Sequence, residues 1–177
     1  MNRELIPLYA FRRFTDVSPD FLREQGIKFL MLDLDSTIAK YCEKTPSDAV
    51  KQWVAAMESN RVTLFIVSNS RRAGRVETFA KPLGIGFIKE ARKPSPAGVL
   101  RALEETGFNK GESALLGDQV FTDTLAANRA GVISIIVRPL NMKNPLLALR
   151  FAIESPFRAA CVFKDRDRTS VSFGLRE

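Results

Sequence analysis

The sequence predicts an α/β fold in which a parallel sheet lies between two layers of helices, a three-layer αβα (Rossmann-like) arrangement. The first observation is that short apolar runs, typical of buried strands, alternate with longer segments whose apolar residues recur at helical spacing. The second is that Gly, Pro or Ser residues mark the ends of these segments. Repeated strand–helix units form parallel sheets, because each helix carries the chain back across a face of the sheet.

The expected elements follow one another without an internal repeat or a low-complexity linker. Ser18-Pro19 opens a short helix that ends at Gly26, because Ser caps a helix, Pro suits its first turn and Gly suits its end. Thr45-Pro46 opens a second helix, whose apolar stripe is expected in the core: Val50, Trp53, Val54 and Met57. Strands are predicted over residues 28–33, 62–67, 85–88, 113–117 and 132–137, and further helices over residues 71–81, 95–106 and 122–130.

Length and composition agree with a single soluble domain. With 177 residues, 45% of them hydrophobic, the chain can bury a core without disulfides. Cys42 and Cys161 form no disulfide framework and have no metal-ligand spacing, which favours a reducing cytoplasmic compartment. Pro7 interrupts the N-terminal apolar stretch, so no signal peptide is predicted, and no segment is long enough to cross a bilayer.

The chain contains no His, and it carries a formal net charge of +7. The absence of His excludes Ser-His-Asp and Cys-His hydrolysis and most zinc hydrolase sites, so acid–base work must fall to carboxylates. The charge favours anionic partners, which include nucleic acids and membrane surfaces. The densest basic run near the expected site is Arg71, Arg72 and Arg75. The sequence leaves open whether this run is a solvated helix face or a substrate contact.

Two carboxylates follow the first core strand. Asp33 and Asp35 come directly after an apolar run, and strand alternation would point both to one side while Leu34 points into the core. Carboxylates at the carboxyl edge of an α/β sheet repel one another unless a cation joins them, and hard oxygen ligands suit Mg²⁺. Taken alone, the motif is also compatible with a capped turn after a core strand.

Later strands end in groups that phosphoryl chemistry uses. Ser68 and Asn69 offer a hydroxyl and exposed backbone amides to phosphate oxygens. Lys93 would neutralise charge on a transferring group. Asp118 and Asp123 bring two more carboxylates to the same edge of the sheet. The chain therefore contains, in order, the groups that phosphoryl transfer needs: a carboxylate nucleophile, a hydroxyl, a lysine and an acid pair.

This ordered set resembles the four motifs of the haloacid dehalogenase (HAD) superfamily, over about residues 1–140. The matching segments are Asp33-x-Asp35-x-Thr37, Ser68, Lys93 and Gly117-Asp118-x-x-x-x-Asp123. Within subfamily IIIA the chain looks most like the YqeG family, which includes mitochondrial phosphatidylglycerophosphatases of fungi. The closer match rests on Gly26-Ile27-Lys28, Ala80-Lys81-Pro82-Leu83-Gly84, Gly117-Asp118-Gln119-x-x-Thr122-Asp123 and Asn128-Arg129-x-Gly131. Ser36 departs from the pattern, because that family usually has Asn there.

The resemblance implies a HAD-type phosphatase that hydrolyses a phosphomonoester through an aspartyl-phosphate. Asp33 would attack phosphorus, and Asp35 would protonate the leaving alkoxide and then deprotonate water. Ser68 and Asn69 would hold the phosphate, and Lys93 would offset its charge.

The resemblance also implies Mg²⁺ as the cofactor. Asp33, Asp118 and the backbone carbonyl of Asp35 would be the metal ligands. Asp123 would orient Lys93 or a metal-bound water.

The spacing of the motifs leaves no room for a cap domain, because only residues 38–45 separate the first acids from the next helix. An open site suits a phosphate on a bulky molecule or at a membrane surface, although a homo-oligomer subunit could supply a lid. The resemblance points to phosphatidylglycerophosphate as the substrate. The open site and the positive charge are compatible with that substrate and with peripheral contact at the inner face of an anionic membrane. A soluble phosphatase for a nucleotide, sugar phosphate or phosphoprotein is the alternative. A non-catalytic nucleic-acid-binding module is the third, but the chain shows no aromatic–basic recognition strip, so we expect no nucleic-acid partner.

Residues 1–140 are expected to form the HAD-like core, and residues 141–177 a C-terminal helical extension and tail. Asn144-Pro145 opens the extension, and Leu146, Leu149, Arg150 and Ile153 mix apolar and basic character. This mixture predicts either packing against the core or a second subunit, or docking on anionic lipid. The tail beyond Lys164 is expected to be partly disordered.

Overall fold

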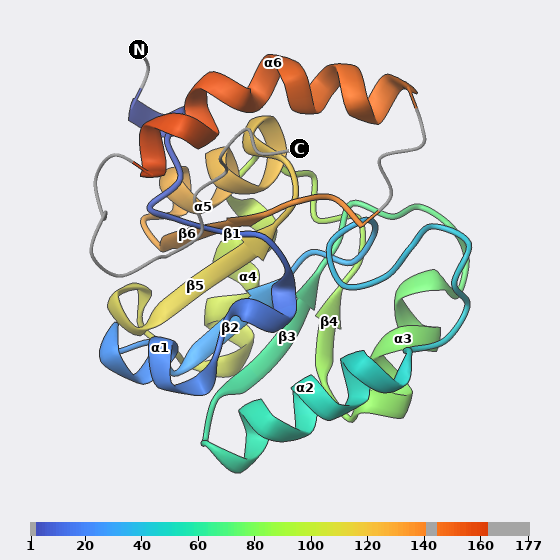
Figure 1. The fold of residues 1–177 in the computed structure, drawn as a ribbon. Coiled ribbons are helices and arrows are strands. Elements are labelled where there is room, and N and C mark those ends of the chain that lie inside the picture. Colours follow the sequence, from blue (N-terminus) through green and yellow to red (C-terminus); the bar gives the residue numbers. More distant parts are fainter. Residues whose placement is uncertain (1–2, 141–144, 163–177) are drawn as a thin grey trace.

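The computed structural model describes residues 3–140 and 145–162. Its centre is a six-stranded parallel sheet in the order β1-β6-β5-β2-β3-β4 (Figure 1). The strands are β1 (Tyr9–Phe11), β2 (Phe29–Leu32), β3 (Thr63–Val67), β4 (Gly86–Ile88), β5 (Ser113–Gly117) and β6 (Ile133–Val137). The predicted α/β class is confirmed, and the described residues contain no separate cap domain.

Helices cover both faces of the sheet, because alternate strand residues are apolar on both sides. In β2, Leu30 and Leu32 belong to one buried cluster, whereas Phe29 and Met31 belong to the other. The first cluster includes residues of α1 (Pro19–Glu24), α2 (Asp48–Ser59) and α3 (Arg75–Leu83). The second includes residues of α4 (Ala97–Thr106) and α5 (Leu125–Ala130).

Several boundaries differ from the predicted ones. The helix predicted over residues 71–81 begins at Arg75, because Gly74 precedes it in a left-handed conformation with φ of 70°. The helix predicted over residues 122–130 opens as a π-helical turn, Val120–Thr124, and becomes α5 only at Leu125. The first core strand ends at Leu32 rather than at residue 33, so strand alternation does not extend through Asp33 and Asp35.

Strand β1 was not predicted. It has only three residues, Tyr9–Phe11, and pairs with β6 at one edge of the sheet. Three short 3-10 helices, Arg3–Leu5, Phe14–Asp16 and Lys110–Glu112, complete the described elements.

The C-terminal extension forms α6 (Pro145–Val162), which lies across the β1 and β6 side of the sheet (Figure 1). Cys161 of this helix joins a small buried cluster with Ala10, Val120 and Ile136. Leu149 and Ile153 are instead more than half exposed, at 59% and 56%. One side of α6 therefore packs on the core. The expected disordered tail lies outside the described residues. None of the described helices is long and apolar enough to span a membrane.

Candidate active site

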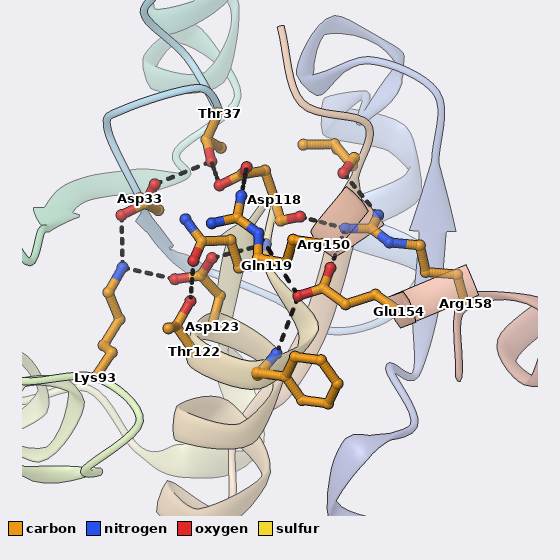
Figure 2. Close-up of polar contacts among 12 residues, drawn as sticks. Asp33, Thr37, Lys93, Asp118, Gln119, Thr122, Asp123, Arg150, Glu154 and Arg158 are labelled. Atoms are coloured by element: carbon orange, nitrogen blue, oxygen red, sulfur yellow. Dashed lines mark hydrogen bonds and ion pairs between the residues drawn. The ribbon is translucent and has the colours of Figure 1, made fainter. Parts of the chain in front are cut away.

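Asp33 and Lys93 form the centre of the site. Both follow strands, Asp33 after β2 and Lys93 in the segment after β4, and parallel strands bring their carboxyl ends to one edge. Lys93 Nζ lies 2.6 Å from Asp33 Oδ1, and the Lys93 side chain is 1% exposed (Figure 2). The chain thus places a carboxylate and an ammonium group together at this edge.

Asp123 is the second anionic partner of Lys93. Its Oδ1 lies 2.7 Å from Lys93 Nζ, close enough for an ion pair although outside hydrogen-bond geometry. Its Oδ2 accepts a hydrogen bond of 3.0 Å from the backbone N–H of Gln119. Gly117 makes room for it, because a Cβ at Gly117 would lie 2.3 Å from Asp123 Cγ. The glycine before Asp118 is therefore a steric requirement of the carboxylate that orients Lys93.

Asp118 lies on the other side of Asp33, and Thr37 joins the two. The Thr37 hydroxyl is 3.1 Å from Asp33 Oδ2 and 3.2 Å from Asp118 Oδ1. Both contacts are drawn in Figure 2. Thr37 and Asp118 are fully buried. A hydroxyl has one proton to donate, so Thr37 can serve only one carboxylate at a time.

Burial and mutual repulsion destabilise the ionised carboxylates. Burial raises the pKa of Asp33 from 3.8 to about 6, although Lys93 lowers it and Asp123 raises it further. Burial, followed by the charges of Asp33 and Asp123, raises the pKa of Asp118 well above its usual range. Burial alone would lower the pKa of Lys93, but Asp123 and Asp33 outweigh it and raise that pKa. Lys93 is therefore protonated at neutral pH.

The carboxylates fit a divalent cation. Asp33, Asp118 and Asp123 each offer an oxygen, and these three oxygens lie within 4.8 Å of one another. Burial is the main reason that the pKa values of Asp33 and Asp118 are raised, so without a cation their ionised forms are disfavoured. Oxygen ligands of this kind suit Mg²⁺. A cation bound here would lower the pKa of both groups, because it favours their ionised forms.

Asp35 lies in a different environment from Asp33. Its Oδ1 accepts hydrogen bonds of 3.0 Å and 2.7 Å from Nε and Nη2 of Arg75. Its side chain is 24% exposed, and none of the described residues donates a hydrogen bond to its Oδ2. No described contact joins Asp35 to Asp118 or to Lys93. The two acids of one motif therefore have separate partners.

Ser68 and Asn69 follow β3 and make local contacts. Ser68 is 2% exposed, and its Oγ accepts a hydrogen bond of 3.1 Å from the backbone N–H of Ser70. The Asn69 amide donates to the carbonyl of Lys93 and accepts from its N–H, both at 2.8 Å. Asn69 therefore holds the Lys93 backbone in place.

A cleft of about 530 Å³ opens beside Lys93. Asn69, Arg71, Glu90, Arg92 and Lys93 line it. The residues that line the cleft carry more positive than negative charge, so it suits an anionic substrate.

Helix α6 also reaches the site, which the sequence did not predict. Arg150 Nη2 lies 3.3 Å from Asp118 Oδ2, the carboxylate oxygen that Thr37 does not contact (Figure 2). The Arg150 side chain is 28% exposed, whereas that of Asp118 is fully buried. The C-terminal extension thus supplies a cation to a carboxylate that the sequence assigned to metal binding.

A buried ion pair fixes α6 to the strand ends. Arg158 donates to the backbone carbonyls of Asp118 and Val137, the latter at 3.0 Å, and its Nη2 lies 2.9 Å from Glu154 Oε2. Glu154 Oε1 accepts from the backbone N–H of Phe121 at 3.4 Å. Glu154 and Arg158 are 0% and 2% exposed. Breaking such a pair leaves a buried charge uncompensated, at a cost of about 3–5 kcal/mol.

A signal for part of this network is present in the sequence. Arg150, Glu154 and Arg158 stand four residues apart, which puts three charges on one side of an otherwise apolar helix. Thr37 belongs to the first motif, but its hydroxyl had no assigned role. Arg75 matches neither interpretation of the basic run, because it is 8% exposed and bound to Asp35.

Comparison with known proteins agrees with this arrangement. The sequence model of the haloacid dehalogenase-like hydrolases matches residues 5–131. The probable phosphatase YqeG of Bacillus subtilis is 34% identical over 140 residues, which cover 79% of this chain and 81% of that protein.

Solved structures show the same fold at lower identity. A 3-deoxy-D-manno-octulosonate 8-phosphate phosphatase from Yersinia pestis is 16% identical with a TM-score of 0.50, covering 85% of this chain and 90% of that one. A Vibrio cholerae structure given the same assignment is 18% identical with a TM-score of 0.52, covering 87% and 93%. The family match, the YqeG relative and the strand-end acids together show that this chain belongs to the haloacid dehalogenase-like hydrolases, as one of their phosphatases.

Proposed function

We propose that this protein is a Mg²⁺-dependent phosphomonoesterase that acts through a phosphorylated Asp33 and whose substrate is carried by lipid. The observation that carries the chemistry is the buried pair of Asp33 and Lys93, 2.6 Å apart. This pair places a nucleophile beside a fixed positive charge, and such preorganised charge stabilises a phosphoryl group during transfer.

The first half of the reaction forms a bond between an Asp33 oxygen and phosphorus while the bond to the leaving oxygen breaks. Lys93 offsets charge on the phosphoryl oxygens, and Asp123 keeps its ammonium group in place. Asp33 and Asp118, with the backbone carbonyl of Asp35, would hold the cation, which when bound would neutralise further phosphoryl charge. Thr37 aligns Asp33 with Asp118.

Asp35 handles the proton in both halves. Its protonated form gives the proton to the leaving alkoxide, and the resulting carboxylate then takes a proton from the water that attacks the phosphorylated Asp33. That attack releases inorganic phosphate and regenerates Asp33. The proton returned to Asp35 restores the starting state.

Charge and exposure around the site support a substrate at an anionic surface. Exposed arginines stand in the segments that follow four of the six strands: Arg12, Arg71, Arg92 and Arg138. These segments belong to the edge of the sheet where Asp33 lies. Basic residues near a membrane are each worth about 1 kcal/mol of attraction to anionic lipid.

Helix α6 supports the same proposal. Its exposed residues Leu149 and Ile153 stand on the helix that brings Arg150 to Asp118. An exposed apolar stripe beside basic residues suits the interface between lipid headgroups and acyl chains. A lipid that carries a phosphomonoester, such as phosphatidylglycerophosphate, would then present its headgroup to the cleft.

The test compares lipid and soluble phosphomonoesters at equal phosphate concentration. Liposomes that contain phosphatidylglycerophosphate should give a kcat/KM at least about tenfold above that for nucleotides and sugar phosphates, a difference of about 1.4 kcal/mol in transition-state binding. Added salt should weaken liposome binding through screening. A tenfold preference for a soluble phosphomonoester would reject the lipid assignment and favour the soluble alternative.

A matched pair of variants tests the contribution of α6. Leu149→Glu should lower activity on liposomes but not on a soluble ester, because it places a charge at the proposed lipid contact. Leu100→Glu alters another exposed apolar residue, which is 37% exposed on α4, and should change neither activity. Equal effects of the two variants would remove α6 from the lipid contact.

A further inference from the structure

We infer that Arg75 is the positioning residue of the acid–base group: it anchors one oxygen of Asp35 and thereby presents the other for proton transfer. This inference rests on the proposed phosphatase mechanism. It concerns a residue that lies outside the four motifs and contacts neither Lys93 nor the carboxylates around Lys93.

The first observation is the geometry of the ion pair. Both Arg75 nitrogens that reach Asp35 bond to Oδ1, at 3.0 Å and 2.7 Å. The other oxygen, Oδ2, receives no hydrogen bond from the described residues. A carboxylate held through one oxygen cannot rotate freely, so its second oxygen keeps a fixed direction.

The second observation is that Arg75 itself is fixed. Its side chain is 6% exposed, and its guanidinium stacks over the Phe79 ring at 4.6 Å. Nη2 also donates to the carbonyl of Lys40 at 3.0 Å, and Nη1 donates to the carbonyl of Glu43. Guanidinium is the side chain best suited to this task, because its planar donors can bind several acceptors at once.

The third observation is the place of those carbonyls. Lys40 and Glu43 belong to the segment between β2 and α2, which follows Asp35 directly. Arg75 is the first residue of α3, so its guanidinium joins the segment before α2 to the helix after α2. Arg72, three residues before α3 begins, also binds this segment, through the Tyr41 carbonyl at 3.2 Å and the Tyr41 ring at 4.3 Å, but does not contact Asp35.

The contacts of Arg75 could serve two functions, stabilising the fold and positioning Asp35, and these can be told apart. Any residue that ties the segment to α3 would stabilise the fold, whereas only a residue bound to Asp35 would affect proton transfer. Proton transfer matters when the leaving group is a strong base. As the P–O bond breaks, an alkoxide needs the Asp35 proton, whereas a dinitrophenolate leaves as a stable anion without one.

The experiment uses this dependence on the leaving group. kcat/KM is measured with glycerol phosphate and with dinitrophenyl phosphate for the wild-type chain, Arg75→Ala, Arg75→Lys and the control Arg72→Ala. Because kcat/KM reports steps up to the first irreversible one, it reads phosphorylation of Asp33 rather than the later hydrolysis.

Arg75→Ala should lower kcat/KM for glycerol phosphate at least about tenfold more than for dinitrophenyl phosphate, as part of the 10²–10⁴-fold that acid–base catalysis supplies is lost. Arg75→Lys, which keeps a donor near Asp35, should recover part of the selective loss. Arg72→Ala should keep the wild-type ratio between the kcat/KM values for the two esters.

A double variant separates positioning from folding. In an Asp35→Asn background there is no acid to position, so adding Arg75→Lys should not change the ratio between the kcat/KM values for the two esters. An equal loss with both esters in Arg75→Ala and Arg75→Lys would overturn the inference and leave Arg75 a purely structural residue. A wild-type chain that releases phosphate neither from these esters nor from liposomes with phosphatidylglycerophosphate would refute the proposed function instead, and the inference would fall with it.

Discussion

Asp33 and Asp35 are two residues apart, yet their carboxylates differ in neighbouring charges, in exposure to solvent and in hydrogen-bond partners. Asp33 is buried beside Lys93, Thr37 and two more carboxylates, and its pKa is raised to about 6. Asp35 is partly exposed and held through one oxygen by Arg75. A dry carboxylate that faces a fixed ammonium group suits bond formation to phosphorus. A wetter one with a free oxygen suits exchange of protons. The contrast teaches that local environment, rather than residue type, divides the roles.

The largest effect should come from removal of the nucleophile. Asp33→Asn keeps the shape of the side chain but cannot form the acyl phosphate, and turnover should fall by roughly ten-thousandfold or more, as for other lost nucleophiles. Phosphate release measured over hours would detect this loss. A circular dichroism spectrum unchanged from wild type is the control for folding. A folded Asp33→Asn variant with near-normal turnover would show that Asp33 is not the nucleophile and would contradict the division of roles between Asp33 and Asp35.

Lys93→Met should come next. The Met side chain keeps the apolar stem and deletes the charge, and losing preorganised stabilisation of this kind costs about a hundredfold or more in kcat. The variant also removes the charge that lowers the pKa of Asp33, so activity should need a higher pH than in wild type. A pH–rate profile measures both effects. An unchanged kcat would assign Lys93 a structural role only.

Thr37→Val should have a smaller effect. It deletes the hydroxyl that lies between Asp33 and Asp118 but keeps the branched shape. Hydrogen bonds to charged groups contribute about 1.5–3 kcal/mol, so a loss of about tenfold to a hundredfold in kcat/KM is expected. The thermal unfolding midpoint provides the control for packing. If kcat/KM does not change, the hydroxyl has no part in aligning the two acids.

The smallest predicted effect is the pH dependence of stabilisation by a divalent cation. Asp33 has a folded-state pKa of about 6 against an ordinary 3.8, so between these values the folded chain holds a proton that the unfolded chain releases. Without a cation, stability should therefore fall as the pH rises through this window. The cation needs the ionised carboxylates, so its apparent affinity should rise by up to about tenfold per pH unit for each proton released.

Thermal unfolding with and without Mg²⁺ checks this dependence. At about pH 8 the cation should raise the unfolding midpoint, and at about pH 5 the increase should be much smaller. Asp33→Asn is the matched control, because it removes one titrating ligand and should flatten the dependence. Equal stabilisation at both pH values would contradict the assignment of the cation to these carboxylates.

The sequence predicts the part of the site that depends on strand ends. Asp33, Lys93, Asp118 and Asp123 converge because each follows a strand of one parallel sheet, and the apolar runs mark those strands. Strand β1 escaped prediction because three residues at a sheet edge carry too little periodicity. The direction of Asp35 escaped it too, because the strand ends at Leu32 and the following turn sets side-chain directions.

Contacts between distant segments are the part that no local pattern reveals. Arg158 binds the Asp118 carbonyl across 40 residues, and Arg75 reaches Asp35 across the same sequence separation. Their burial depends on how α6 and α3 pack, which only the tertiary structure fixes. The spacing of Arg150, Glu154 and Arg158 puts three charges on one side of α6, but it does not reveal which groups they contact.

The most direct test of the division of roles is to find where phosphate is held during turnover. The Asp35→Asn variant is mixed with Mg²⁺ and dinitrophenyl phosphate, whose leaving group needs no acid, and is quenched in acid. It should accumulate a phosphorylated peptide that mass spectrometry assigns to Asp33, because water attack lacks its base. An Asp33→Asn sample treated in parallel should carry no phosphate on this peptide. Phosphate on another residue, or turnover with no phosphorylated peptide in either sample, would contradict the account.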